Sequence, residues 1–324
     1  MARKHPFELV LIAIMSKTAF VFPGQGSQQV GMLGKLAETE TVITSTFFEA
    51  SDALGYDLWA LVQQGPEEEL NKTEKTQPAL LTAGVALWRL WQEKQGTAPA
   101  FLAGHSLGEY TALVCSGALS MGDAVKLVEK RGQFMQSAVP LGTGAMAAII
   151  GLDDDKVVAS CANAAQGEVV EAVNFNSPGQ VVIAGNKAAV ERAMDLAKEA
   201  GAKRALPLPV SAPSHCALMK PAAEQLAAEL AKLEIASPQI PVVQNVSAQV
   251  VSDPESIRTN LVEQLYRPVL WVDTVKLLVQ EGITETVECG PGKVLSGLNK
   301  RIDRSLVTKA IGDPTSLESA LETA

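Results

Sequence analysis

Residues 101–116, FLAGHSLGEYTALVCS, decide the fold of this chain. The apolar run 99–103 predicts a buried strand, 104–108 a sharp turn, and 109–116 the start of a helix packed on the sheet. This is the pattern of a nucleophile elbow, in which Gly104 and Gly108 let the turn be tight enough to expose the Ser106 hydroxyl. The unpaired N–H groups of the new helix would face an oxyanion above that oxygen.

The bare pattern G-x-S-x-G is weak, since it arises by chance in roughly one chain in ten of this length and composition. The strand before it and the helix after it are the context that the pattern requires. We therefore take Ser106 as the candidate nucleophile.

Composition describes an ordinary globular protein of 324 residues, 47% of them hydrophobic, enough for one large domain with an insertion or for two domains. The net charge of −9 argues against nonspecific nucleic-acid binding. The four cysteines have no C-x-x-C spacing, so neither a metal site nor a disulfide framework is indicated. A reduced, cytoplasmic location fits this cysteine usage.

The N-terminus superficially resembles a signal peptide, because Arg3 and Lys4 precede an apolar run over residues 7–15. Glu8 interrupts that run, no small-residue cleavage site follows, and the run is too short to span a bilayer. We expect residues 1–15 to be a leader outside the domain, with Met15 as the natural initiator and no membrane association.

A first strand is predicted at 18–22, followed by the glycine-rich loop 23–28, PGQGSQ. Dinucleotide binding would require glycine at position 29, where the chain has Gln29, and an acidic residue after a second strand. The alternative is that the loop supplies backbone N–H groups and the Gln25 amide to a site at the strand ends. Helical spacing follows at 42–54 and 79–95, with a polar surface connection predicted at 63–77.

Arg131 faces inward on a helix predicted over about 123–135. At 100° per residue it lies at the centre of an apolar stripe made by Ala124, Leu127, Val128, Phe134 and Met135. A buried guanidinium requires a carboxylate or comparable acceptor. Periodicity leaves two alternatives open: an internal salt bridge or snorkelling side chain, and a carboxylate on the substrate.

Residues 145–210 form a series of short elements in the order β-α-β-β-α-β, predicted at 146–152, 153–165, 169–174, 181–185, 186–200 and 203–210. This is the split βαβ, ferredoxin-like arrangement. We therefore expect an α/β fold: an α/β-hydrolase-like large domain (16–140 and 212–324) with a parallel sheet and the elbow, and an inserted ferredoxin-like small domain (141–211). In the second half of the large domain we expect a helix at 221–233, strands at 242–246 and 286–289, and helices after 273 and 293.

His215 is the candidate base by elimination, because a nucleophilic serine needs one and the chain has three histidines. His5 lies in the leader, and His105 diverges from its neighbour Ser106 at an elbow. No acid between Ser106 and His215 stands out as the third member. A backbone or amide carbonyl could orient the imidazole instead.

Six segments in order carry a resemblance: PGQGSQ at 23–28, GHSLGEY at 104–110, RGQFM at 131–135, NFNSPGQ at 174–180, PSH at 213–215 and GPGK at 290–293. From about residue 18 to the end, the chain closely resembles the bacterial malonyl-CoA:acyl carrier protein transacylases of type II fatty acid synthesis.

The resemblance implies a role for each site residue. Ser106 would accept the acyl group, His215 would be its base, and the backbone carbonyl of Gln264 would orient the imidazole. Backbone N–H groups of Gln25 and Leu107 would form the oxyanion hole.

The resemblance also implies how the substrate is bound. Arg131 would clamp the free carboxylate of the malonyl group, while Asn174 and Asn176 would line the small-domain side of the cleft.

The implied reaction is transfer of malonyl from malonyl-CoA to the phosphopantetheine thiol of acyl carrier protein, through a malonyl-serine intermediate with ping-pong kinetics. It needs no metal and no cofactor beyond the coenzyme A thioester that is its substrate. We expect a monomer that binds no nucleic acid and docks the acidic carrier protein through local basic residues, the candidates being Lys203, Arg204, Lys293, Lys300 and Arg301.

Two other functions remain open at this point. A serine esterase or thioesterase would use the same elbow with water as acceptor, and an inward Arg131 argues for an anionic acyl group instead. A non-catalytic carrier-docking subunit would keep the fold without the chemistry, and the intact Ser106, His215 and Arg131 argue against it.

Overall fold

The structure is a computed structural model and describes residues 17–210 and 212–322. The predicted leader, 1–15, lies outside the described residues. Two sheets organise the described chain: a six-stranded sheet in the order β10-β9-β1-β2-β7-β8 and a four-stranded sheet in the order β4-β5-β3-β6.

The six-stranded sheet is parallel except for its edge strand β8, which pairs antiparallel with β7. Its strands are β1 (Thr18–Phe22), β2 (Phe101–Gly104), β7 (Val242–Gln244), β8 (Gln249–Val250), β9 (Glu285–Glu288) and β10 (Val307–Ala310). Phe20 and Phe22 point to one face of the sheet, Ala19 and Val21 to the other, and all four are fully buried. Both faces are therefore covered by helices, as a parallel sheet requires.

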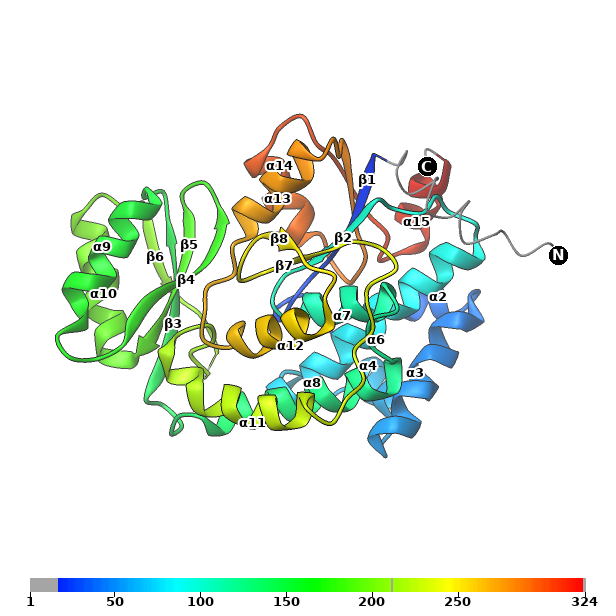
Figure 1. The fold of residues 1–324 in the computed structure, drawn as a ribbon, viewed down its shortest axis with the longest axis horizontal. Coiled ribbons are helices and arrows are strands. Elements are labelled where there is room, and N and C mark those ends of the chain that lie inside the picture. Colours follow the sequence, from blue (N-terminus) through cyan, green and yellow to red (C-terminus); the bar gives the residue numbers. More distant parts are fainter. Residues whose placement is uncertain (1–16, 211, 323–324) are drawn as a thin grey trace.

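Most helices of the large domain pack on the Phe20 face, and α13 and α14 pack on the other (Figure 1). These helices are α2 (Gly34–Ala37), α3 (Thr41–Leu54), α4 (Leu58–Gln64), α5 (Glu67–Leu70), α6 (Thr73–Glu93), α7 (Leu107–Cys115), α8 (Met121–Ser137), α11 (Lys220–Leu230), α12 (Pro254–Glu263), α13 (Trp271–Gln280), α14 (Val294–Ile302) and α15 (Pro314–Glu322), with a 3-10 turn η1 (Ala217–Met219).

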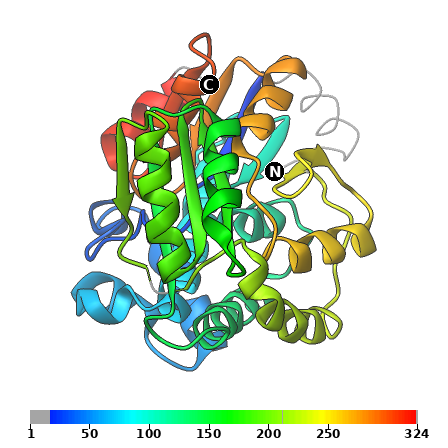
Figure 2. The same ribbon diagram turned by 90° about the vertical axis from the view of Figure 1, so that its left-hand side faces the viewer.

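The four-stranded sheet is antiparallel and consists of β3 (Gly144–Ile150), β4 (Val170–Ser177), β5 (Gln180–Asn186) and β6 (Arg204–Pro207). Helices α9 (Asp154–Ala165) and α10 (Lys187–Glu199) cover the face that points away from the large domain (Figures 1 and 2). The strand order is that of the ferredoxin-like fold, so the predicted fold class is confirmed. All four strands fall inside 141–211, the segment predicted to be the small domain, although its boundaries stay a prediction.

The elbow is tight because two glycines allow close backbone contact. A Cβ on Gly104 would lie 1.9 Å from the carbonyl carbon of Gly108, and one on Gly108 would lie 2.0 Å from the carbonyl oxygen of Phe22. Real side chains do not tolerate such distances, so the strand, turn and helix can meet only with glycine at these positions.

Helix α6 differs from the sequence prediction, because it begins at Thr73 rather than after Pro78. Pro78 removes one helical hydrogen bond, but burial of Thr73, Thr76 and Gln77 holds the first turns in place. The connection predicted to be a polar surface segment is therefore partly helical and partly buried. The sequence analysis also did not predict α12, β10 and α15.

Candidate active site

Ser106 lies between β2 and α7 with φ 52° and ψ −108°, a backbone conformation that is strained for a residue with a side chain. Asn245, just after β7, holds this turn from the side. Its Oδ1 accepts the Ser106 N–H at 2.7 Å, and its Nδ2 donates to the Gly104 carbonyl at 2.6 Å. The strained conformation is thus fixed by hydrogen bonds from the neighbouring strand.

Ser106, His215 and Gln264 form a hydrogen-bonded chain. Ser106 Oγ lies 2.8 Å from His215 Nε2, and His215 Nδ1 lies 2.6 Å from the backbone oxygen of Gln264. A carbonyl oxygen can only accept, so Nδ1 carries the proton and Nε2 presents its lone pair to the serine hydroxyl. The structure thus brings the three predicted residues together in the arrangement of a nucleophile and its base.

The His215 imidazole is held neutral. The ring is 3% exposed, and burial, with the Arg131 guanidinium as second cause, lowers the pKa of His215 to about 3. A neutral imidazole at physiological pH is the form that can take a proton from serine.

Arg131 is 1% exposed, as its place on the apolar stripe predicts. One terminal nitrogen donates to Gln77 Oε1 at 2.8 Å, and the other donates to Gln264 Oε1 at 3.0 Å and to Ser106 Oγ at 3.2 Å. Within the described residues no carboxylate lies within salt-bridge distance of it. The guanidinium is therefore a buried cation beside Ser106, held by neutral acceptors.

Gln25 and Leu107 are predicted to provide oxyanion N–H groups, and Leu107 directly follows Ser106. Leu107 is the first residue of α7, so its N–H has no acceptor within the helix. The 23–28 loop packs on the elbow, because a Cβ on Gly24 would lie 2.6 Å from the His105 carbonyl oxygen. The Gln25 side chain bonds Thr73 Oγ1 at 3.4 Å, which leaves its backbone role a prediction.

Asn174 and Asn176 lie on β4, the small-sheet strand that meets the large domain at Val269. Asn176 Oδ1 is 2.8 Å from His105 Nε2, a hydrogen bond between the two domains directly beside the nucleophile. His105 is engaged there, as expected from its divergence at the elbow. Asn174 is buried, and its Oδ1 has no hydrogen bond in the described structure.

Three buried polar residues of the site were not singled out from the sequence: Gln77, Glu109 and Asn245. Gln77 could have been found from helical spacing. If α6 is extended from Pro78 toward the N-terminus, Gln77 falls on the same buried face as Leu81 and Gly84. The Asn245 N–H donates to Glu109 Oε2, and the two residues are 136 positions apart in the sequence. Local spacing cannot predict such a pair.

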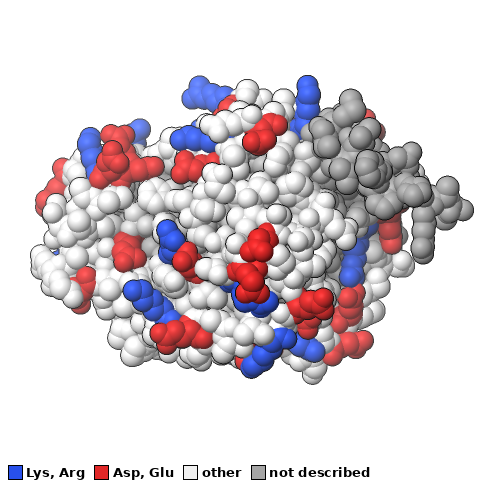
Figure 3. Space-filling model, in the orientation of Figure 1, with Lys and Arg blue, Asp and Glu red and all other residues white. Residues whose placement is uncertain are grey.

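The five basic docking candidates differ in their contacts. Lys300 Nζ donates to the carbonyls of Arg304 and Leu306, and Arg301 donates to Gln180 on the small domain. On the face shown in Figure 3, basic and acidic side chains are interspersed. Lys203, Arg204 and Lys293 are exposed, and their side chains make no hydrogen bond within the part of the chain that the structure describes.

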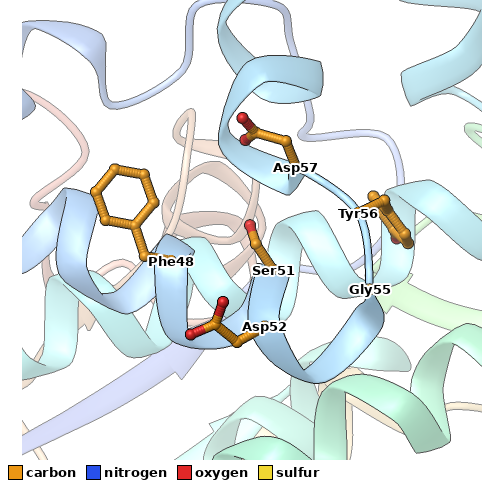
Figure 4. A pocket seen from close by; sticks show the side chains of 6 residues that line it. All are labelled: Phe48, Ser51, Asp52, Gly55, Tyr56 and Asp57. Carbon is orange, nitrogen blue, oxygen red and sulfur yellow. The ribbon is translucent and has the colours of Figure 1, made fainter.

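Elsewhere, an open hollow lies between α3 and α4, lined by Phe48, Ser51, Asp52, Gly55, Tyr56 and Asp57 (Figure 4). It contains none of the predicted site residues. Across residues 17–210 and 212–322, no cluster of three or more potential metal ligands occurs, and no helix is long and apolar enough to cross a membrane.

Comparison with known proteins decides the family. A profile described as the acyl transferase domain matches residues 19–302. The malonyl CoA-acyl carrier protein transacylase of Escherichia coli (strain K12) is 61% identical over 308 residues, 95% of this chain and 100% of that protein. The chain belongs to this transacylase family.

Other members of the transacylase family agree in sequence and structure. The Bacillus subtilis transacylase is 49% identical over 95% of this chain and 98% of its own length. The crystal structure of the Vibrio cholerae acyl carrier protein S-malonyltransferase has 62% identity and a TM-score of 0.93, covering 94% of this chain and 99% of that one. A malonyl-transacylase in complex with a type II PKS acyl-carrier protein has 60% identity and a TM-score of 0.94, covering 95% and 100%.

The resemblance stated from six sequence segments is thus confirmed, and so is the prediction that the chain is an acyltransferase. Because the family is one of acyltransferases, we do not interpret the 23–28 loop as a dinucleotide-binding loop.

Proposed function

We propose that this chain transfers a malonyl group from malonyl-CoA to the phosphopantetheine thiol of acyl carrier protein through an ester on Ser106. The overall reaction is that named for the family to which the chain belongs, so this sequence-based prediction is confirmed at that level. The residue roles below are the proposal.

In the first half-reaction the malonyl carboxylate binds Arg131, and the thioester carbonyl lies against the N–H groups of Gln25 and Leu107. Ser106 Oγ attacks the carbonyl carbon while His215 Nε2 takes its proton. The tetrahedral intermediate collapses as the C–S bond breaks, and the imidazolium returns the proton to the coenzyme A thiolate. The product is a malonyl ester on Ser106.

In the second half-reaction the carrier protein's pantetheine thiol replaces coenzyme A. His215 takes the thiol proton, the sulfur attacks the ester carbonyl, and the serine oxygen leaves with that proton. The Gln264 carbonyl keeps the imidazole in the correct tautomer throughout. No metal or redox step is needed in this scheme.

The observation that carries the proposal is Arg131. The guanidinium is buried, and within the described residues its terminal nitrogens donate to neutral acceptors, so an incoming carboxylate would be the first charged group to pair with it directly. One of its terminal nitrogens donates to Ser106 Oγ at 3.2 Å, so a carboxylate bound to the guanidinium would lie close to the serine oxygen. In a malonyl group a single methylene separates the free carboxylate from the carbonyl carbon that Ser106 would attack.

The acceptor distinguishes this proposal from a serine hydrolase. The test mixes enzyme with malonyl-CoA and follows coenzyme A and free malonate separately, before and after adding carrier protein. The proposal predicts a burst of coenzyme A equal to the enzyme, little malonate, and steady turnover only with carrier protein. Steady malonate release without carrier protein would identify a hydrolase.

We further propose that the enzyme is a cytoplasmic monomer that uses no cofactor, and that Lys203, Arg204 and Lys293 form part of the carrier-protein docking surface. Electrostatic docking is sensitive to salt and to charge reversal. Reversing these three charges should raise KM for carrier protein while leaving Ser106 acylation by malonyl-CoA unchanged. An unchanged KM at every ionic strength would remove this surface from consideration.

A further inference from the structure

Glu109 is a buried carboxylate that the mechanism above does not use. It is the third residue of α7 and 1% exposed. Across the described residues no salt bridge includes it. A carboxylate removed from water is costly unless hydrogen bonds or a cation compensate it, so its position calls for a physical reason.

Helix capping does not provide that reason. A glutamate at the third position of a helix commonly accepts the N–H of the residue that precedes the helix. Here that residue is Ser106, and its N–H is already donated to Asn245 Oδ1. Glu109 is therefore free to accept other donors.

One oxygen of Glu109 accepts two hydrogen bonds from the active-site wall. Oε2 lies 2.8 Å from the backbone nitrogen of Asn245 and 3.0 Å from Gln264 Nε2. Both donors belong to residues that hold the site, Asn245 through the elbow and Gln264 through His215. The carboxylate thus links the two segments that surround Ser106.

The bond to Gln264 fixes which way that amide points. Gln264 Nε2 faces two acceptors, Glu109 Oε2 and the Ser106 carbonyl at 3.0 Å, while Oε1 accepts from Arg131. Reversing the amide would set its oxygen against two acceptors and its NH₂ group against the guanidinium. With Glu109 present, Oε1 has to face Arg131.

Arg131 uses one nitrogen for both of its contacts at the nucleophile, the bond to Gln264 Oε1 and the bond to Ser106 Oγ. A change in the Gln264 amide would therefore reach the guanidinium through the side-chain oxygen Oε1, whereas His215 bonds the Gln264 backbone oxygen.

We propose that Glu109 is a positioning residue for acyl-group selection: by accepting the Gln264 Nε2 hydrogen it orients the Gln264 amide, and through it the Arg131 guanidinium that receives the acyl carboxylate. The inference rests on the proposed function, because it takes Arg131 as the carboxylate clamp. Glu109 does not touch the substrate.

The test measures single-turnover acylation of Ser106 by malonyl-CoA and by acetyl-CoA on the same preparation, so that inactive protein cancels in the ratio of the two rates. Glu109→Leu removes the acceptor and should lower the malonyl-to-acetyl ratio roughly 10-fold. Glu109→Gln keeps one acceptor oxygen for the Gln264 Nε2 hydrogen, so its ratio should fall only a few-fold. Gln264→Leu should reproduce the Leu effect with Glu109 intact, even if Glu109→Leu folds poorly.

A matched control is Glu288→Gln, which alters a second buried carboxylate of the same domain. Glu288 accepts the N–H groups of Leu295 and Ser296 at the start of α14, and in the described residues it shares no hydrogen bond with Arg131, Gln264 or Ser106. This variant should change the thermal midpoint and leave the malonyl-to-acetyl ratio within about twofold.

The double variant tests whether Glu109 acts on the malonyl-to-acetyl ratio through Gln264. In a Gln264→Leu background, Glu109→Leu should lower the ratio no further, since its route to Arg131 is already absent. An unchanged ratio in Glu109→Leu, or an equal further fall in that background, would overturn the positioning role. A wild-type ratio near one, unaffected by Arg131→Ala, would instead reject the clamp and the proposed function with it.

Discussion

The two domains contribute unequally to the site. On the large domain, Ser106, His215, Arg131 and Gln264 are tied to one another by hydrogen bonds of 2.6 to 3.2 Å. On the small domain, the two predicted asparagines make one side-chain hydrogen bond within the described residues, in which Asn176 Oδ1 accepts from His105 Nε2. From this difference we expect the proposed chemistry to depend mainly on residues of the large domain.

The largest effect should come from the base on the large domain. His215→Ala removes the acceptor of the serine proton, and general bases contribute roughly 10²–10⁴ in rate. Acylation of Ser106 by malonyl-CoA, followed by stopped flow, should fall within that range. A loss of less than tenfold would contradict the difference between the two domains, because the acylation rate would then not depend on the hydrogen-bonded residues of the large domain.

The next effect concerns the clamp. Arg131→Ala removes charge-assisted hydrogen bonds worth about 1.5–3 kcal/mol, so kcat/KM for malonyl-CoA should fall roughly 10- to 150-fold. The acetyl group has no free carboxylate, so kcat/KM for acetyl-CoA should fall much less. Arg131→Lys is the matched control, because it retains the charge without the planar fork and should recover part of the loss. Equal losses for the two acyl donors would contradict a carboxylate clamp.

These two residues also show what the sequence could and could not predict. Glycine spacing around Ser106 and the apolar stripe around Arg131 are local patterns, so the elbow and the inward guanidinium follow from sequence. The ferredoxin-like insertion followed from the alternation of short elements.

The hydrogen-bond partners of Ser106 and Arg131 could not be predicted from the sequence. Gln77 and Asn245 reach the site from segments that only the folded chain brings together, and Glu109, although three residues from Ser106, meets its partners Asn245 and Gln264 only in the fold. The residue type at a position does not show what its backbone carbonyl binds. The prediction that the Gln264 carbonyl orients His215 therefore rested on the family resemblance alone. The start of α6 was missed because Pro78 was taken as a helix boundary, whereas tertiary burial of Gln77 maintains the helix before it.

The pH profile tests the burial of His215. Because its pKa is lowered to about 3, the imidazole stays neutral as the pH falls through its ordinary value near 6.5. Acylation by acetyl-CoA, which does not require the clamp, should therefore change less than twofold between pH 7 and about pH 5. With an ordinary pKa only about 3% of the base would be neutral at pH 5, and the rate would fall roughly 30-fold.

The smallest effect should come from the small domain. Asn176→Ala removes the acceptor of His105 Nε2, a single hydrogen bond worth about 1 kcal/mol, so acylation should slow by roughly fivefold or less. Asn174→Ala is the matched control, and we expect a change within about twofold because Asn174 Oδ1 has no hydrogen bond in the described structure. A hundredfold loss in either variant would move part of the chemistry onto the small domain.

The most direct test of the account is the mass of the intact protein after brief mixing with malonyl-CoA, with peptide mapping of any adduct. We predict one malonyl group per chain, located on Ser106, absent in Ser106→Ala, and lost when acyl carrier protein is added as malonyl-carrier forms. An adduct at another residue, or transfer to carrier protein by Ser106→Ala at the wild-type rate, would contradict the covalent mechanism.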